Sequence, residues 1–130
     1  MVTVQSNDIS FMVLLSASVL DGLTWMIEDH RKAWLPLGGS QADVEEALET
    51  YKKWCLITRE NPDDKKAIKC LKRLGAKKDQ WSAIANPHAR SFMNRFPAET
   101  LRHVNIPVLA LFAEGDSCTD PKRNKDPLDP

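Results

Sequence analysis

The stretch Ile106-Pro107-Val108-Leu109-Ala110-Leu111-Phe112-Ala113-Glu114-Gly115-Asp116 decides the fold class of this 130-residue chain. Its first part, from Pro107 to Phe112, is a short and continuous apolar run. Such a run is typical of a strand that is buried on both faces of a parallel sheet. Proline is tolerated at the first position of a strand. The residues from Ala113 to Asp116 then predict a turn at the carboxyl end of this strand.

A second run of the same kind lies near the start of the chain, at residues Ile9–Leu15. Small residues follow it, and Asp21-Gly22 predict a turn. We expect the two strands to be parallel and adjacent, joined by a right-handed crossover. Because two parallel strands do not make a stable sheet by themselves, the sequence indicates a piece of a larger sheet, with exposed edges that favour an oligomer.

The long segment between the two strands has helical spacing. Leu23–Trp34 predicts one helix, which Pro36 and the following glycines interrupt. Ser40 then predicts an N-cap, with Asp43 completing a capping box. The apolar face of the helix that follows is spaced by three and four residues, at Val44, Ala47, Leu48, Tyr51 and Cys55.

The third helix of this segment has clear signals at both ends. Asn61 is the predicted N-cap and Pro62 the predicted first residue. Gly75 is the predicted stop. The lysine- and arginine-rich run from Lys65 to Lys78 is flanked by acidic residues, so a solvated helix face is favoured over a nucleic-acid site. Core packing is favoured for the four tryptophans, and the alternative is that one or two line an acyl or side-chain pocket: Trp25, Trp34, Trp54 and Trp81.

Composition excludes several classes of protein. Eighteen Lys and Arg residues balance 18 Asp and Glu residues, so no net charge attracts nucleic acid or an anionic membrane. No apolar run is long enough to span a bilayer. Three widely spaced cysteines, Cys55, Cys70 and Cys118, indicate neither a disulfide scaffold nor a zinc site. If Met1 is the true start, the absence of a signal segment predicts a cytoplasmic protein; a lost signal would leave the compartment unknown.

Asp116 is the candidate functional residue, because it follows directly on the carboxyl end of the second strand. Ligands of open α/β sheets bind at this end of the strands. A carboxylate in this place can orient a histidine and stabilise its imidazolium form. The alternative is a turn aspartate that only caps the next element.

The segment 106–116 resembles the strand-plus-acid segment of α/β-hydrolases, whose pattern is P-V-L-x-L-x-G-x-x-D. The flanks agree with the resemblance. Residues 92–105 resemble the helix before that strand, residues 121–124 the segment after the acid, and residues 8–16 the strand after the nucleophile helix. The similarity is greatest to serine hydrolases of the prolyl-oligopeptidase-like and serine-aminopeptidase-like groups.

The resemblance implies an α/β fold: a partial α/β-hydrolase domain over residues 1–130, with two parallel strands and a helical cap. Its parts are a strand at 8–18, the cap at 22–86, a helical lead-in at 87–105, the second strand with its acid turn at 106–120, and a polar tail at 121–130. It also implies hydrolysis of a small-molecule or peptide ester or amide through a Ser-His-Asp triad, with no metal or cofactor. Asp116 would be the acid of that triad, with Asp120 as the rival in poorer register.

The sequence departs from the family pattern in four ways. After the acid, the family has Val-Pro, and this chain has Cys118-Thr119-Asp120-Pro121. Ala113 stands where the family has glycine. No G-x-S-x-G occurs, and the nearest match is Gly38–Ala42, whose Ser40 follows a proline-containing segment and reads better as an N-cap. The family order is Ser, Asp, His, yet all three histidines precede Asp116: His30, His88 and His103. We therefore expect nucleophile and base to lie outside the chain, which alone would be inactive. The alternative is a small, non-catalytic helical interaction module.

Overall fold

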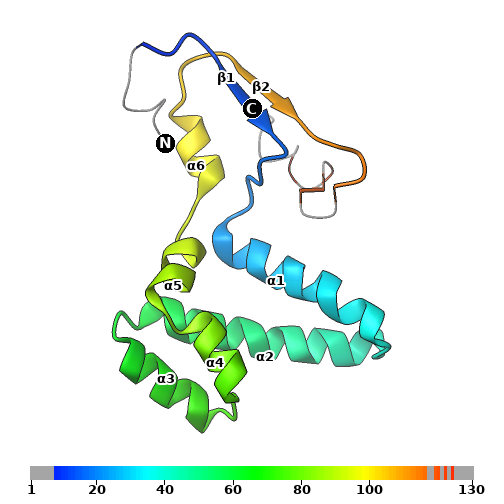
Figure 1. Ribbon diagram of the computed structural model, residues 1–130, viewed down its shortest axis with the longest axis vertical. Coiled ribbons are helices and arrows are strands. Elements are labelled where there is room, and N and C mark those ends of the chain that lie inside the picture. The colour runs from blue at the N-terminus through cyan, green and yellow to red at the C-terminus, as the bar shows by residue number, and fades with distance from the viewer. Residues whose placement is uncertain (1–7, 117–118, 121, 123, 125–130) are drawn as a thin grey trace. The chain divides into compact units, whose positions relative to one another are not determined.

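The computed structural model describes residues 8–116, 119, 120, 122 and 124 (Figure 1). The chain divides into two compact units. The strand unit takes the described residues of 1–21 and 96–130, and the helical unit takes residues 22–95. The described chain is mostly helical and has two parallel strands, so the predicted α/β class holds in this general sense.

The strand unit contains β1 (Met12–Leu15), α6 (Pro97–Arg102) and β2 (Val108–Leu111). The two strands pair in parallel, with Met12 opposite Val108 and Leu15 opposite Leu111. The Met12 N–H donates to the Pro107 carbonyl at 2.9 Å, and the Ser16 N–H donates to the Leu111 carbonyl at 2.8 Å. The prediction of adjacent parallel strands is therefore confirmed, with Pro107 placed just before the strand as an acceptor.

The prediction that both strands are buried on both faces is wrong for this chain. Leu15 is 71% exposed and Leu109 is 54% exposed. Among the described residues the sheet has only these two strands, so each strand has one neighbour and little else covers its side chains. The apolar sequence of the strands is typical of a sheet interior, but the described chain provides none.

The helical unit contains five α-helices and one short 3₁₀ helix within the described residues. They are α1 (Gly22–Trp34), η2 (Leu35–Leu37), α2 (Gln41–Glu60), α3 (Asp64–Arg73), α4 (Lys78–Ile84) and α5 (Pro87–Met93). A single hydrophobic core joins all the α-helices; its most buried members include Cys55, Leu71, Ile84 and Met93. Helix α5, assigned to the lead-in from sequence, lies in this unit. The Arg90 guanidinium of α5 pairs with Asp64 and donates to the Thr58 carbonyl at 3.0 Å.

Local capping signals explain where α2 begins and where α3 ends. The Ser40 hydroxyl accepts from the Asp43 N–H at 3.2 Å, and the Asp43 carboxylate accepts from the Ser40 N–H at 3.0 Å. This is the predicted capping box of α2. After α3, Gly75 takes a left-handed φ of 84°. Its N–H donates to the Lys72 carbonyl and the Ala76 N–H to that of Leu71, which is a Schellman motif.

The prediction that Asn61 caps α3 and that Pro62 is its first residue is wrong, because the helix begins at Asp64. Asp63 is the N-cap, and its carboxylate accepts from the N–H groups of Lys65 and Lys66. Asn61 instead ends α2, because its side-chain amide donates to the Ile57 carbonyl at 2.7 Å. Asn61 and Asp63 are both able to cap a helix and lie only two positions apart. Asn61 caps the end of α2, and Asp63 caps the start of α3.

The two ends of the helical unit meet at Gly22. The Gly22 N–H donates to the Arg95 carbonyl at 2.9 Å. A Cβ atom at position 22 would lie 1.8 Å from the Phe92 carbonyl oxygen, so the backbone of α1 contacts that of α5 directly. Only glycine permits this approach. The chain thus leaves the helical unit beside the point where it enters.

We expect Gly22→Ala to destabilise the helical unit by about 3 kcal/mol or more, because the added methyl group must displace backbone rather than a flexible side chain. Gly39→Ala is the matched control. Its Cβ would meet only side-chain atoms at 3.8 Å, so it should change stability by less than about 0.5 kcal/mol. Urea unfolding followed by the helical circular-dichroism signal measures both. Equal stability of the two variants would contradict the close contact at Gly22.

Candidate functional site

The turn after β2 places Asp116 beyond the carboxyl end of that strand. The Asp116 N–H donates to the Ala113 carbonyl at 3.1 Å, which closes the turn predicted from Ala113-Glu114-Gly115-Asp116. Asp116 is partly buried. The sequence-predicted acid therefore follows a parallel strand by one tight turn, at the sheet end where open α/β sheets bind their ligands.

The Asp116 carboxylate is oriented by Thr119. It accepts from the Thr119 N–H at 3.2 Å with one oxygen and from the Thr119 hydroxyl with the other. Thr119 is itself only 6% exposed. These two bonds fix the plane of the carboxylate.

The rival acid, Asp120, serves as a local cap. Its carboxylate accepts from the Lys122 N–H at 3.0 Å. Its backbone carbonyl accepts from both the backbone N–H and the side-chain amide of Asn124. Within the described residues, Asp120 therefore forms hydrogen bonds with the segment that follows it, whereas the backbone of Asp116 closes the turn after β2.

Asn124 connects the segment after Asp116 to the residues that follow β1, and sequence reasoning missed this role. Its side chain is 1% exposed, and its carbonyl oxygen accepts from the Val19 N–H at 2.8 Å. Val19 is also almost fully buried. A single amide side chain thus connects two segments more than a hundred residues apart in sequence. No local pattern marks an asparagine in a polar tail for this role.

Ser40 and the three histidines have structural places. The Ser40 hydroxyl accepts from the Asp43 N–H, which confirms the N-cap interpretation, and donates to the Asp43 carboxylate at 2.7 Å. His88 and His103 are exposed. The His30 ring stacks on Tyr51 with centroids 3.8 Å apart, and its Nδ1 lies 3.2 Å from the Met26 carbonyl oxygen. Burial lowers the pKa of His30. His30 therefore packs against the helical core as a neutral ring.

Buried polar groups in the helical core are poor nucleophiles. Cys55 is fully buried, and burial raises the pKa of its thiol to about 11. Burial likewise raises the pKa of Tyr51, whose hydroxyl lies beside Cys55. Because the thiolate is the reactive form, Cys55 is unreactive at neutral pH while the unit stays folded.

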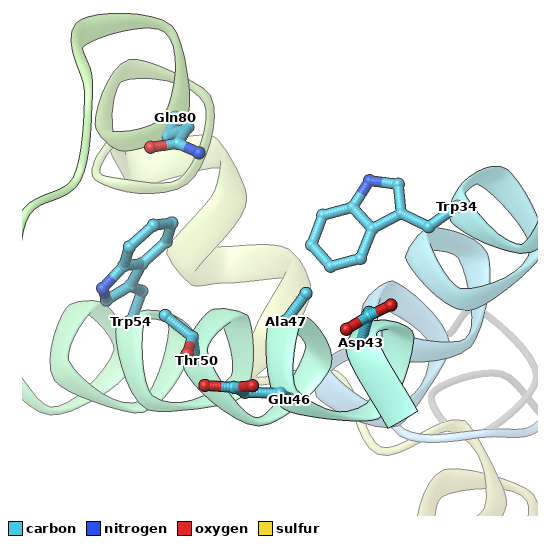
Figure 2. A pocket seen from close by; sticks show the side chains of 7 residues that line it. All are labelled: Trp34, Asp43, Glu46, Ala47, Thr50, Trp54 and Gln80. Carbon is cyan, nitrogen blue, oxygen red and sulfur yellow. The ribbon is translucent and has the colours of Figure 1, made fainter. Parts of the chain in front are cut away.

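An open hollow of about 300 Å³ lies on the helical unit (Figure 2). Most of its wall comes from one face of α2, and the ends of α1 and α4 supply the rest. Its lining residues are Trp34, Asp43, Glu46, Ala47, Thr50, Trp54 and Gln80. Two of the four tryptophans, Trp34 and Trp54, therefore line a surface hollow while they also pack against the core.

The described residues give no support for a metal site or a membrane-spanning helix, and they place the basic run on an exposed face. No group of three or more His, Cys, Asp or Glu side chains in that part of the chain is arranged to hold a metal ion. None of its helices has the length and apolar character needed to cross a bilayer. The basic run of α3 and the start of α4 is exposed, as expected of a solvated face: Lys65, Lys66, Lys69, Lys72, Arg73, Lys77 and Lys78.

We expect Asn124→Ala to weaken the strand unit by about 1–3 kcal/mol, because the buried Val19 N–H loses its acceptor. Amide hydrogen exchange measured by NMR should show faster exchange at Val19 and at Ser16. Lys122→Ala is the control, since Lys122 is exposed and only its backbone N–H bonds to Asp120. Unchanged protection of Val19 in the Asn124 variant would show that this bond does not hold the two segments together.

Similarity to known proteins assigns this chain to no family. No protein-family model, no curated protein and no solved structure matches the chain.

Proposed function

We propose that this chain is the acid-bearing part of a serine hydrolase of the α/β-hydrolase type, which cleaves ester or amide bonds in small molecules or peptides. The observation that carries the proposal is the position of Asp116. It lies one turn past the end of β2, which pairs in parallel with β1, and a helical insertion separates the two strands in sequence. This order of strand, helical insertion, strand and acid is the order that the resemblance implies.

In the proposed reaction, a serine hydroxyl attacks the carbonyl carbon of the substrate and a histidine takes the serine proton. The histidine then gives this proton to the leaving group as the acyl bond breaks. A water molecule hydrolyses the acyl-enzyme by the same two steps. Asp116 would accept from the other ring N–H of the histidine and hold it in the required tautomer. The hydrogen bonds from Thr119 support this role, because they orient the carboxylate beforehand.

The serine and the histidine are proposed to come from segments outside these 130 residues. Ser40 caps α2 and donates to Asp43, and His30 is packed against Tyr51. The exposed apolar side chains of β1 and β2 agree with a sheet that further strands complete, or with pairing between two copies of the chain. The triad uses side chains alone, so the proposal requires neither metal nor cofactor, and its partner is the substrate rather than nucleic acid or a membrane.

The helical unit favours one alternative, a non-catalytic interaction module. It has its own core, and its two ends adjoin at Gly22 and Arg95, so it has the features of a self-contained domain. The flanking coding sequence separates the two proposals. An upstream frame that encodes a strand, G-x-S-x-G and a helix would support the hydrolase, and its absence would support the module.

The 130-residue chain should react neither with a fluorophosphonate probe nor with activated esters. A serine without a paired base keeps a high pKa and remains a weak nucleophile. Intact-protein mass spectrometry after incubation with the probe measures the labelling, and Ser40→Ala shows whether any label is at the capping serine. Labelling at Ser40 would overturn the proposal that the nucleophile lies elsewhere.

In the longer protein, Asp116→Asn should leave the fold intact but lower turnover by about 10⁴-fold, the loss that a wrong histidine tautomer causes in a Ser-His-Asp protease. Asp120→Asn is the matched control. It should cost far less, because Asp120 bonds to the segment after it. Ester turnover and circular dichroism of both variants test this pair. An equal or larger loss at Asp120 would show that Asp116 is not the acid.

A further inference from the structure

The hollow on the helical unit has aromatic walls on two sides. Figure 2 shows the indole rings of Trp34 and Trp54 on opposite sides of the space, with Ala47 and Thr50 between them on α2. Trp34 is held edge-on against Tyr51 and His30, at centroid distances of 6.2 and 5.3 Å. Both indoles also pack against the core. The walls are therefore fixed by the fold, which lowers the entropy cost of binding.

Two aromatic rings of the helical unit outside the hollow have a positively charged side chain over one face. The Lys72 ammonium lies 4.9 Å from the centroid of Trp81, and the Arg95 guanidinium lies 5.2 Å from that of Phe92. Such contacts arise because the negative face of an aromatic ring attracts a positive charge. Aromatic rings of the helical unit thus bind positively charged side chains.

The charge of the hollow is negative. Its lining includes the carboxylates of Asp43 and Glu46, and its other polar members, Thr50 and Gln80, are neutral. Hydrogen bonds from the Ser40 hydroxyl and backbone lower the pKa of Asp43, so this carboxylate stays ionised well below neutral pH. The nearby Glu45, by contrast, pairs with Arg31. The hollow thus combines aromatic faces with two carboxylates, those of Asp43 and Glu46, for which the described part of the chain shows no salt bridge.

We propose that the hollow of Trp34, Trp54, Asp43 and Glu46 binds an organic cation, a small molecule that carries an alkylated ammonium group. The volume of about 300 Å³ leaves room for a ligand of this size. The indoles contact the alkyl groups and attract the charge, and the carboxylates exclude anions. A metal ion or an ordinary ammonium ion fits less well, because each is strongly hydrated and gains little from aromatic walls. This proposal does not rest on the hydrolase proposal, since every lining residue lies in the helical unit.

The test is an NMR titration of the full chain with choline, observing the four indole N–H resonances. The expected result is saturable shifts for Trp34 and Trp54 and none for Trp25. The matched ligand is the uncharged carbon isostere of choline, in which a tert-butyl group replaces the trimethylammonium group. Binding of choline without binding of the isostere supports the proposal. Equal binding of both, or no saturable shift with choline, overturns it.

Variants separate the two contributions. Trp54→Leu should weaken choline binding about three- to tenfold, the range expected for loss of one indole face. Glu46→Gln should weaken it about two- to fivefold and leave the fold unchanged, since Glu46 is exposed. Glu49→Gln is the control, because Glu49 lies on α2, pairs with Lys52 and does not line the hollow. An equal loss in the Glu46 and Glu49 variants would show that net charge, rather than this site, attracts the ligand, and would overturn the proposal.

Discussion

The parallel pairing of β1 with β2 depends on a connection that returns the chain to its starting point, because parallel neighbours cannot be joined by a tight turn. Bringing distant segments together has an entropic cost that grows with the length of flexible chain between them. Here most of that chain folds on its own core, and the contact of Gly22 with Phe92 and Arg95 brings its ends together. Once the helical unit is folded, only short segments remain to be closed before the strands can meet.

The acid turn depends on a second set of constraints, all within the strand unit. The turn hydrogen bond from Asp116 to Ala113 sets the position of the acid, and Thr119 sets the orientation of its carboxylate. Asn124 then holds the following segment to the residues after β1. Backbone and side-chain hydrogen bonds therefore hold the strand unit together, whereas a hydrophobic core holds the helical unit together. The side chains of the strands are largely exposed.

Local signals in the sequence predicted the elements well, and long-range contacts could not be predicted from it. The capping box of Ser40 and Asp43 and the stop at Gly75 are properties of a few neighbouring residues, so both were correct. Asn61 was misplaced because two adjacent helix ends competed for it. The prediction that the strands are buried was wrong, because the apolar character of a strand shows that it can be buried but not whether other residues cover it. The bridge of Asn124 and the hollow between Trp34 and Trp54 each join residues from separate segments, and no spacing rule contains that information.

The adjoining ends of the helical unit also have an evolutionary consequence. Units whose entry and exit lie side by side are tolerated as insertions inside other domains, because the host chain is interrupted at a single place. The hydrogen bond between Gly22 and Arg95 gives residues 22–95 this property. Such a block can be exchanged for another of similar end separation by recombination at its two borders, while the register of β1 and β2 is kept. Divergence of the helices can then proceed at a different rate from divergence of the strands, and a new surface can be acquired without rebuilding the turn that carries Asp116.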